Sequence, residues 1–128
     1  MDTADTPPPR PRAVLIVDDQ PEFCRLAREL LDGRAGLRVV GEATSGAEAL
    51  TLARALAPDV VVLDVEMPGL HGFETARRLL AAAPDLAIVL VSNTDEAQYG
   101  EVAHTVGARA FLPKREFSAR ALTRLLEA

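Results

Sequence analysis

The sequence predicts an α/β domain built on a doubly wound, five-stranded parallel sheet of order 2-1-3-4-5. From Ala13 onward, short apolar runs alternate with longer amphipathic segments, so that each run is followed by a helix-sized stretch. Three of the runs are continuous blocks of Val, Ile and Leu, a pattern typical of strands that helices cover on both faces. Parallel strands need right-handed crossovers, so five strand-then-helix units within 128 residues favour one sheet with helices on both sides.

The predicted strands are the apolar runs themselves. The first, third and fourth runs lack alternation and are expected at the centre of the sheet. The five strands are predicted over residues 13–17, 37–43, 60–63, 87–91 and 110–112.

Start and stop signals delimit the five predicted helices. Pro21 suits a first helical position, and Gly33 ends the first helix. Ser45 and Glu48 form a capping-box pattern at the start of the second helix, which Pro58 closes. The other three helices are predicted over residues 72–83, 95–106 and 118–128, and the fourth helix has the weakest apolar pattern.

Composition and charge exclude several classes of protein. The formal net charge of −5 argues against direct binding of nucleic acid or of an anionic membrane surface. Cys24 is the sole cysteine, which excludes an intrachain disulfide and suits a reducing compartment. No apolar run approaches the roughly 18 residues of a membrane helix, so we expect a cytoplasmic protein. The Pro- and charge-rich start of the chain predicts a disordered tail over residues 1–12, which leaves residues 13–128 as the folded domain.

Polar side chains follow four of the five predicted strands. Asp18 and Asp19 follow the first strand, Asp64 the third, Ser92 the fourth and Lys114 the fifth. Because the carboxyl ends of parallel strands share one edge of the sheet, we expect these groups to meet where the strand order reverses. Neighbouring carboxylates repel each other unless a cation intervenes, and a set of oxygen donors without thiolate or imidazole suits Mg²⁺. The sole lysine of a chain with thirteen arginines adds a compact ammonium group to this edge.

Taken in order, the motifs VDD, LDVEMPGLHG, VSN and AFLPK resemble those of the receiver (REC) domain of two-component response regulators. The resemblance covers residues 13–128. The segments VVGEA and LPKREFSARAL resemble in particular the receivers of the NarL/LuxR type. The resemblance implies a flavodoxin-like (βα)5 fold, in agreement with the architecture predicted from the strands.

The same resemblance assigns roles to the site residues. Asp64 would be the nucleophile that accepts a phosphoryl group from the phosphohistidine of a sensor histidine kinase. Mg²⁺ would be bound directly by Asp19, Asp64 and the backbone carbonyl of Glu66, with Asp18 acting through water. The remaining site residues are Ser92 and Lys114, which would hold the phosphoryl oxygens, and Phe111, an aromatic that would reorient together with Ser92 on activation.

Phosphorylation would add negative charge and acceptor oxygens at Asp64, and in the family this changes the surface of the fourth helix, the fifth strand and the fifth helix. The expected partners are a sensor histidine kinase, a second copy of the chain in a phosphorylation-dependent homodimer, and a DNA-binding effector domain that is separate from this chain. No direct contact with nucleic acid or membrane is expected. Such a protein is a switch and not an enzyme with multiple turnover. Whether the chain is a stand-alone regulator or part of a transcription factor stays open.

Two other classes of protein fit the sequence less well. An aspartyl phosphatase of the haloacid dehalogenase type uses similar groups, but it places the nucleophile after its first strand and carries extra length for a lid. A nucleotide- or flavin-binding module is disfavoured because no G-x-G-x-x-G or P-loop follows the first strand.

For several residues near the motifs we expect no direct part in phosphoryl transfer. The Lys114–Arg115 bond lacks the proline that often follows this lysine, so its isomer stays open. Asn93 stands where the family usually has a small residue, and we expect it to narrow access to the phosphoryl group. The others are His71, expected as a solvated loop residue; His104, on a helix surface; Cys24, a small buried side chain; and Tyr99, in the core or at an interface.

Overall fold

Five parallel strands form one sheet in the order β2-β1-β3-β4-β5, which confirms the predicted topology. The computed structural model describes residues 10–94 and 98–127. The strands are β1 (Arg12–Val17), β2 (Leu37–Ala43), β3 (Val60–Asp64), β4 (Ala87–Ser92) and β5 (Ala110–Pro113). The helices are α1 (Pro21–Leu31), α2 (Gly46–Leu56), α3 (Gly72–Ala82), α4 (Tyr99–Thr105) and α5 (Ala119–Glu127), with a short 3₁₀ turn, η2 (Lys114–Glu116), between β5 and α5.

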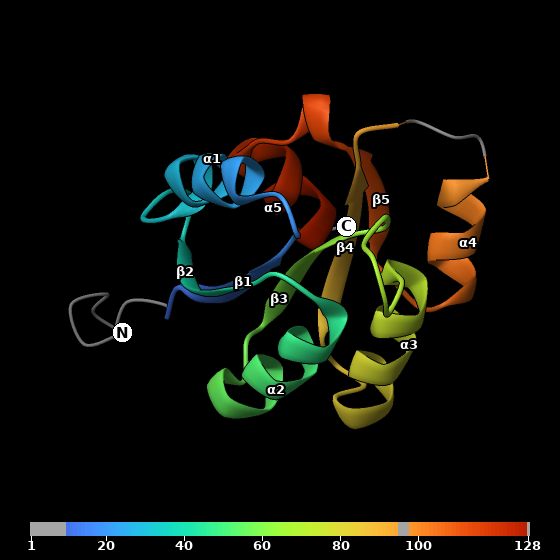
Figure 1. The fold of residues 1–128 in the computed structure, drawn as a ribbon. Helices are drawn as coiled ribbons and strands as arrows, with labels where there is room; N and C mark the ends of the chain where they lie inside the picture. Colours follow the sequence, from blue (N-terminus) through green and yellow to red (C-terminus); the bar gives the residue numbers. More distant parts are fainter. Residues whose placement is uncertain (1–9, 95–97, 128) are drawn as a thin grey trace.

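Helices cover both faces of the sheet: α1 and α5 lie on one side, and α2, α3 and α4 lie on the other (Figure 1). Successive strand residues point to opposite faces, so Val14 and Ile16 of β1 pack toward α1 and α5, whereas Leu15 and Val17 pack toward the other three helices. All four side chains are fully buried. Burial on both sides explains why the central strands are unbroken apolar runs, since each such side chain contributes about 1.5–3 kcal/mol.

The predicted capping signals act as expected at α1 and α2. The backbone N–H of Glu48 donates to Ser45 Oγ at 3.1 Å, and the Glu48 carboxylate accepts from the backbone N–H of Thr44 at 2.7 Å. Pro21 is the first residue of α1, where its missing N–H leaves no hydrogen bond unmade. Helix α1 ends at Leu31, two residues before Gly33, whose φ of 76° turns the chain toward β2.

Some element boundaries differ from the predicted ones. β1 begins at Arg12 and not at Ala13, because the Arg12 backbone N–H donates to the carbonyl of Gly36 at 2.8 Å although its side chain is exposed. Three strands reach one residue further than predicted, ending at Asp64, Ser92 and Pro113. Of the predicted tail over residues 1–12, residues 1–9 lie outside the described residues. Residues 95–97 of the predicted fourth helix also lie outside them.

Both edges of the sheet are irregular. In β2 the pairing with β1 shifts between Val39 and Gly41, which leaves Val40 as an extra residue in the ladder. β5 has four residues and ends at Pro113, which has no N–H to donate. Among the described residues, no helix has the length and apolar character needed to cross a membrane.

Candidate functional site

Three acidic side chains gather at the carboxyl ends of β1 and β3. The two strands are neighbours, with Val17 paired to Leu63, so Asp18 and Asp64 follow side by side. Oxygens of Asp18, Asp19 and Asp64 all lie within 4.8 Å of one another. Asp18 is fully buried and Asp64 is 4% exposed, whereas Asp19 faces solvent. The fold therefore builds the predicted acidic cluster from two adjacent strand ends.

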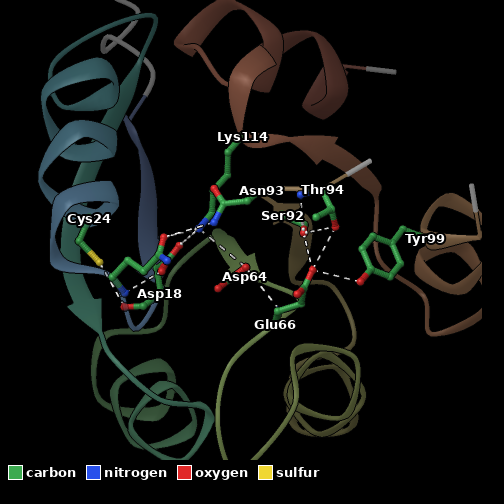
Figure 2. A network of polar contacts seen from close by, with 10 residues as sticks. Asp18, Cys24, Asp64, Glu66, Ser92, Asn93, Thr94, Tyr99 and Lys114 are labelled. Atoms are coloured by element: carbon green, nitrogen blue, oxygen red, sulfur yellow. Dashed lines mark hydrogen bonds and ion pairs between the residues drawn. The ribbon is translucent and has the colours of Figure 1, made fainter. Parts of the chain in front are cut away.

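Lys114 is the cation closest to this cluster. Its Nζ lies 2.6 Å from Asp18 Oδ2 and 3.8 Å from Asp64 Oδ1, and its side chain is 7% exposed (Figure 2). Two further contacts hold the ammonium: it donates to Gln20 Oε1 at 3.4 Å, and it lies 4.5 Å from the centre of the Phe23 ring. A buried carboxylate without a partner is costly, and Lys114 supplies that partner for Asp18.

The donor set fits a hard divalent cation such as Mg²⁺. The ligand atoms available are oxygens, as that ion prefers. Asp18 already has a partner for each oxygen, since Oδ1 accepts from the backbone N–H of Gln20 at 2.8 Å and Oδ2 faces Lys114. Asp19 and Asp64 are thus the carboxylates best placed for direct ligation, which agrees with the water-mediated role that the family resemblance implies for Asp18.

The carboxyl group of Asp64 is a weaker acid than that of an ordinary aspartate. Burial, followed by the charge of Asp18, raises its pKa from 3.8 to about 7; Lys114 and the backbone N–H of Glu66 act in the opposite direction. The N–H of Glu66 donates to Asp64 Oδ1 at 3.4 Å. A bound cation would favour the ionised carboxylate, which is the form that can act as a nucleophile.

Ser92 is buried at the end of β4, and its hydroxyl donates to Glu66 Oε1 at 2.9 Å. The same carboxylate oxygen accepts from Thr94 Oγ1 and from the hydroxyl of Tyr99, each at 3.1 Å (Figure 2). These three hydrogen bonds hold the pKa of Glu66 below its usual value. The hydroxyl that was predicted to hold phosphoryl oxygens therefore has a carboxylate partner in this structure.

An array of aromatic side chains extends from this network toward β5. The ring of Tyr99 contacts Phe111 edge-on with centroids 5.3 Å apart, and it contacts Phe73 of α3 at 5.8 Å. Phe111 is partly buried in the core on the α3 and α4 side. Tyr99 thus lies between the Glu66 network and the aromatic that was predicted to reorient.

The loop from Asp64 to α3 approaches the backbone of β3 closely at Gly72. A Cβ atom at this position would lie 2.3 Å from the carbonyl oxygen of Asp64, so only glycine fits without movement of the chain. The N–H of Gly72 donates to the carbonyl of Val65 at 3.0 Å, and Gly69 adopts a φ of 77° earlier in the loop. The loop therefore fixes the position of Asp64 from its C-terminal side.

The structure brings together Asp18, Asp19, Asp64 and Lys114 as predicted, and it adds side chains that the sequence did not indicate. Gln20 and Phe23 surround the lysine, and Thr94 and Tyr99 surround Glu66. The sequence did not mark these four side chains as site residues, because each one contributes through a contact with a residue that is distant in sequence. Of the other residues near the motifs, His71 is exposed and caps α3 through Nδ1, Cys24 is buried, and the Lys114–Arg115 bond, like every described peptide bond, is trans.

The family model for the response regulator receiver domain matches residues 14–127, and the chain belongs to this family. One relative is the response regulator GacA of Pseudomonas aeruginosa, 40% identical over 101 residues that make up 79% of this chain and 47% of GacA. Another is a protein-glutamate methylesterase/protein-glutamine glutaminase of Vibrio parahaemolyticus, 39% identical over 103 residues, which cover 80% of this chain and 28% of that protein. The chain spans about half the length, or less, of these curated relatives.

Solved structures agree with the family and with the fold. The signal receiver domain of the response regulator NarL from Mycobacterium tuberculosis superposes with a TM-score of 0.85 at 32% identity, over 94% of this chain and 99% of that one. A LuxR-family response regulator from Aurantimonas gives a TM-score of 0.81 at 28% identity, over 91% of this chain and 82% of that one. The predicted receiver fold is confirmed, and the haloacid dehalogenase alternative finds no support.

Proposed function

We propose that this chain is the phosphoacceptor switch of a two-component system, with Asp64 as the residue that is phosphorylated. The observation that supports this most directly is the cluster of Asp18, Asp19 and Asp64 paired with one buried lysine at adjacent strand ends. In the proposed step, a carboxylate oxygen of Asp64 attacks the phosphorus of a kinase phosphohistidine. The P–N bond breaks, an acyl phosphate forms, and the histidine nitrogen takes up a proton.

Each site residue has a role in this step. Asp19, Asp64 and the backbone carbonyl of Glu66 would hold Mg²⁺, and Asp18 would contact it through water. Mg²⁺ supplies positive charge for the phosphoryl oxygens, which matters because the loose transition state of phosphoryl transfer is stabilised mainly by electrostatics. Lys114, whose Nζ lies 3.8 Å from Asp64, is close enough to contact a phosphoryl oxygen on that residue. Ser92 would donate its hydroxyl to another oxygen.

The output is proposed to run through the surface of α4, β5 and α5. Movement of Ser92 toward the phosphoryl group would let Phe111 shift inward, which changes the packing of this surface and favours a homodimer. The proposed partners are the kinase and a DNA-binding effector domain. We propose that the protein acts in the cytoplasm and that its phosphorylation regulates transcription. Support for the effector comes from GacA, of which the matched residues make up 47%, so that more than half of that relative lies outside the match.

The test is mass spectrometry after incubation with acetyl phosphate and Mg²⁺. The wild-type protein should gain one phosphate that is stable to acid and labile to base. Asp64→Asn should gain none, whereas Asp85→Asn, at an exposed carboxylate near the opposite ends of the strands, should behave like the wild type. An equal gain in Asp64→Asn would contradict the assignment, and repeated turnover of a phosphate monoester would favour a phosphatase.

A further inference from the structure

One carboxylate oxygen of Glu66 accepts hydrogen bonds from three hydroxyl groups on two separate elements. Ser92 and Thr94 belong to the end of β4 and the loop after it, and Tyr99 is the first residue of α4. The donor–acceptor distances are 2.9, 3.1 and 3.1 Å. Glu66 itself follows Asp64 by two residues, so this oxygen connects the loop after β3 both to β4 and to α4 (Figure 2).

The hydroxyl of Ser92 has one proton, and two acceptors compete for it. In the structure, Ser92 donates to Glu66, while the backbone N–H of Thr94 donates to Ser92 Oγ at 3.1 Å. A phosphoryl group on Asp64 would offer acceptor oxygens with more negative charge than the carboxylate. A single O–H makes one strong hydrogen bond, so a bond from Ser92 to such a phosphoryl group would replace its bond to Glu66.

Tyr99 connects this competition to α4. Its ring contacts Phe111 and Phe73, and its hydroxyl reaches Glu66. α4 has seven residues, of which Ala103 is fully buried, and its first residue, Tyr99, is partly buried against the core. The bond between Tyr99 and Glu66 therefore links the first turn of α4 directly to the loop that follows Asp64.

Resting on the proposed phosphorylation of Asp64, we propose that Glu66 and Tyr99 form a latch that stabilises the unphosphorylated state. The latch consists of the hydrogen bonds from Ser92 and Tyr99 to Glu66. While it is closed, Glu66 competes for the Ser92 hydroxyl and keeps α4 docked. Capture of Ser92 by a phosphoryl group removes the bond between Glu66 and β4, leaves Glu66 bonded to Thr94 of the following loop, and so weakens the hold of Glu66 on Tyr99. Tyr99 is thus a positioning residue that acts through Glu66.

The first test uses the fluorescence of Tyr99, which is the sole tyrosine in a chain without tryptophan. A carboxylate that accepts a hydrogen bond from the phenol group of a tyrosine quenches the fluorescence of that tyrosine. Addition of Mg²⁺ with beryllofluoride, an analogue of the phosphoryl group, should raise the emission of the wild-type protein. Asp64→Asn should show no change, and Glu66→Ala, which lacks the acceptor of the Tyr99 hydroxyl, should be bright from the start. Unchanged wild-type emission while fluorine NMR shows bound beryllofluoride would overturn the latch.

The second test measures the dissociation constant of beryllofluoride in the presence of Mg²⁺. Tyr99→Phe removes the hydroxyl and keeps the ring, so it should tighten binding about fivefold, which corresponds to about 1 kcal/mol, the typical net contribution of one intramolecular hydrogen bond. In a Glu66→Ala background the same change should have no effect, because the side chain that accepts the hydrogen bond of Tyr99 is absent. Thr105→Val, which deletes an α4 hydroxyl bonded to its own helix, should bind like the wild type.

These outcomes separate the latch from the proposed function. If Asp64 is phosphorylated and the site binds beryllofluoride, but Tyr99→Phe binds it like the wild type or keeps its fivefold effect beside Glu66→Ala, only the latch is wrong. If no phosphate is found on Asp64 and beryllofluoride does not bind, both proposals are wrong.

Discussion

The metal-free protein should lose stability as the pH rises from weakly acidic to weakly basic values, and Asp64 should be the cause. Burial and the charge of Asp18 raise the pKa of Asp64 from 3.8 to about 7 in the folded protein. Between these values the folded protein holds a proton that the unfolded chain has released, so the unfolding free energy falls as the pH rises. The contribution of Asp64 is complete below 3.8 and is lost as the pH passes through about 7.

The size of this effect follows from the two pKa values. The difference between 3.8 and about 7 corresponds to about 4 kcal/mol, at 1.36 kcal/mol for each pKa unit. That is a large part of the roughly 5–15 kcal/mol by which domains are stable. Among the described residues, Glu66 and Cys24 also have shifted pKa values, but they contribute little between about pH 5 and about pH 8, since the pKa of Glu66 is lowered from 4.5 and burial raises that of Cys24 to about 11.

Urea unfolding in the presence of EDTA, at about pH 5 and about pH 8, measures the part of this loss that falls above pH 5, which is about 3 kcal/mol for the two pH units up to about 7. Asp64→Asn should remove most of the difference between the two pH values and should be the more stable protein at the higher one. Mg²⁺ should restore stability to the wild type at the higher pH, because it binds the ionised carboxylates of the folded state alone. Equal pH dependence in the wild type and in Asp64→Asn would refute the reasoning.

Three substitutions test other parts of the site. Gly72→Ala should lower the unfolding free energy by about 2 kcal/mol, because its Cβ would meet the backbone of β3, whereas Gly100→Ala on α4, with open space around it, should be neutral or stabilising; similar losses in both would contradict the close approach. Lys114→Met should cost about 3 kcal/mol or more at neutral pH without Mg²⁺, because Asp18 loses its partner, and an unchanged urea midpoint would show that the ion pair is not needed. Asn93→Ala should be phosphorylated faster by acetyl phosphate than the wild type, since the Asn93 amide donates to Gln20 Oε1 at 3.5 Å beside Lys114; equal rates in a mass-spectrometric time course would end that idea.

The elements that the sequence predicted well are those that depend on local pattern. The run of Val60, Val61, Val62 and Leu63 is buried on both faces, so its composition alone identified a central strand. A capping box is likewise complete within four residues, as at Ser45. The acids after β1 and β3 could be placed together because the topology of a parallel sheet leaves few alternatives.

The parts that could not be predicted depend on distant contacts. The family resemblance implied only a backbone role for Glu66, yet its carboxylate accepts a hydrogen bond from Tyr99, thirty-three residues later. Lys114 was placed near Asp64, but its closest oxygen belongs to Asp18, because the ring of Phe23 and the amide of Gln20 hold the ammonium over α1. Such orientations follow from how helices pack on the sheet, which no local pattern records.

The irregular edges of the sheet restrict how two copies of this chain can associate. An unbroken edge strand offers a ladder of free N–H and C=O groups to any other strand, which invites aggregation. At one edge of the sheet, the extra residue at Val40 interrupts the regular ladder of β2. At the other edge, β5 has four residues and ends at Pro113, so it has few backbone groups with which another strand could pair. Intermolecular strand addition is therefore discouraged at both borders, and any regulated self-association is left to the helical faces, where packing can respond to a distant charge.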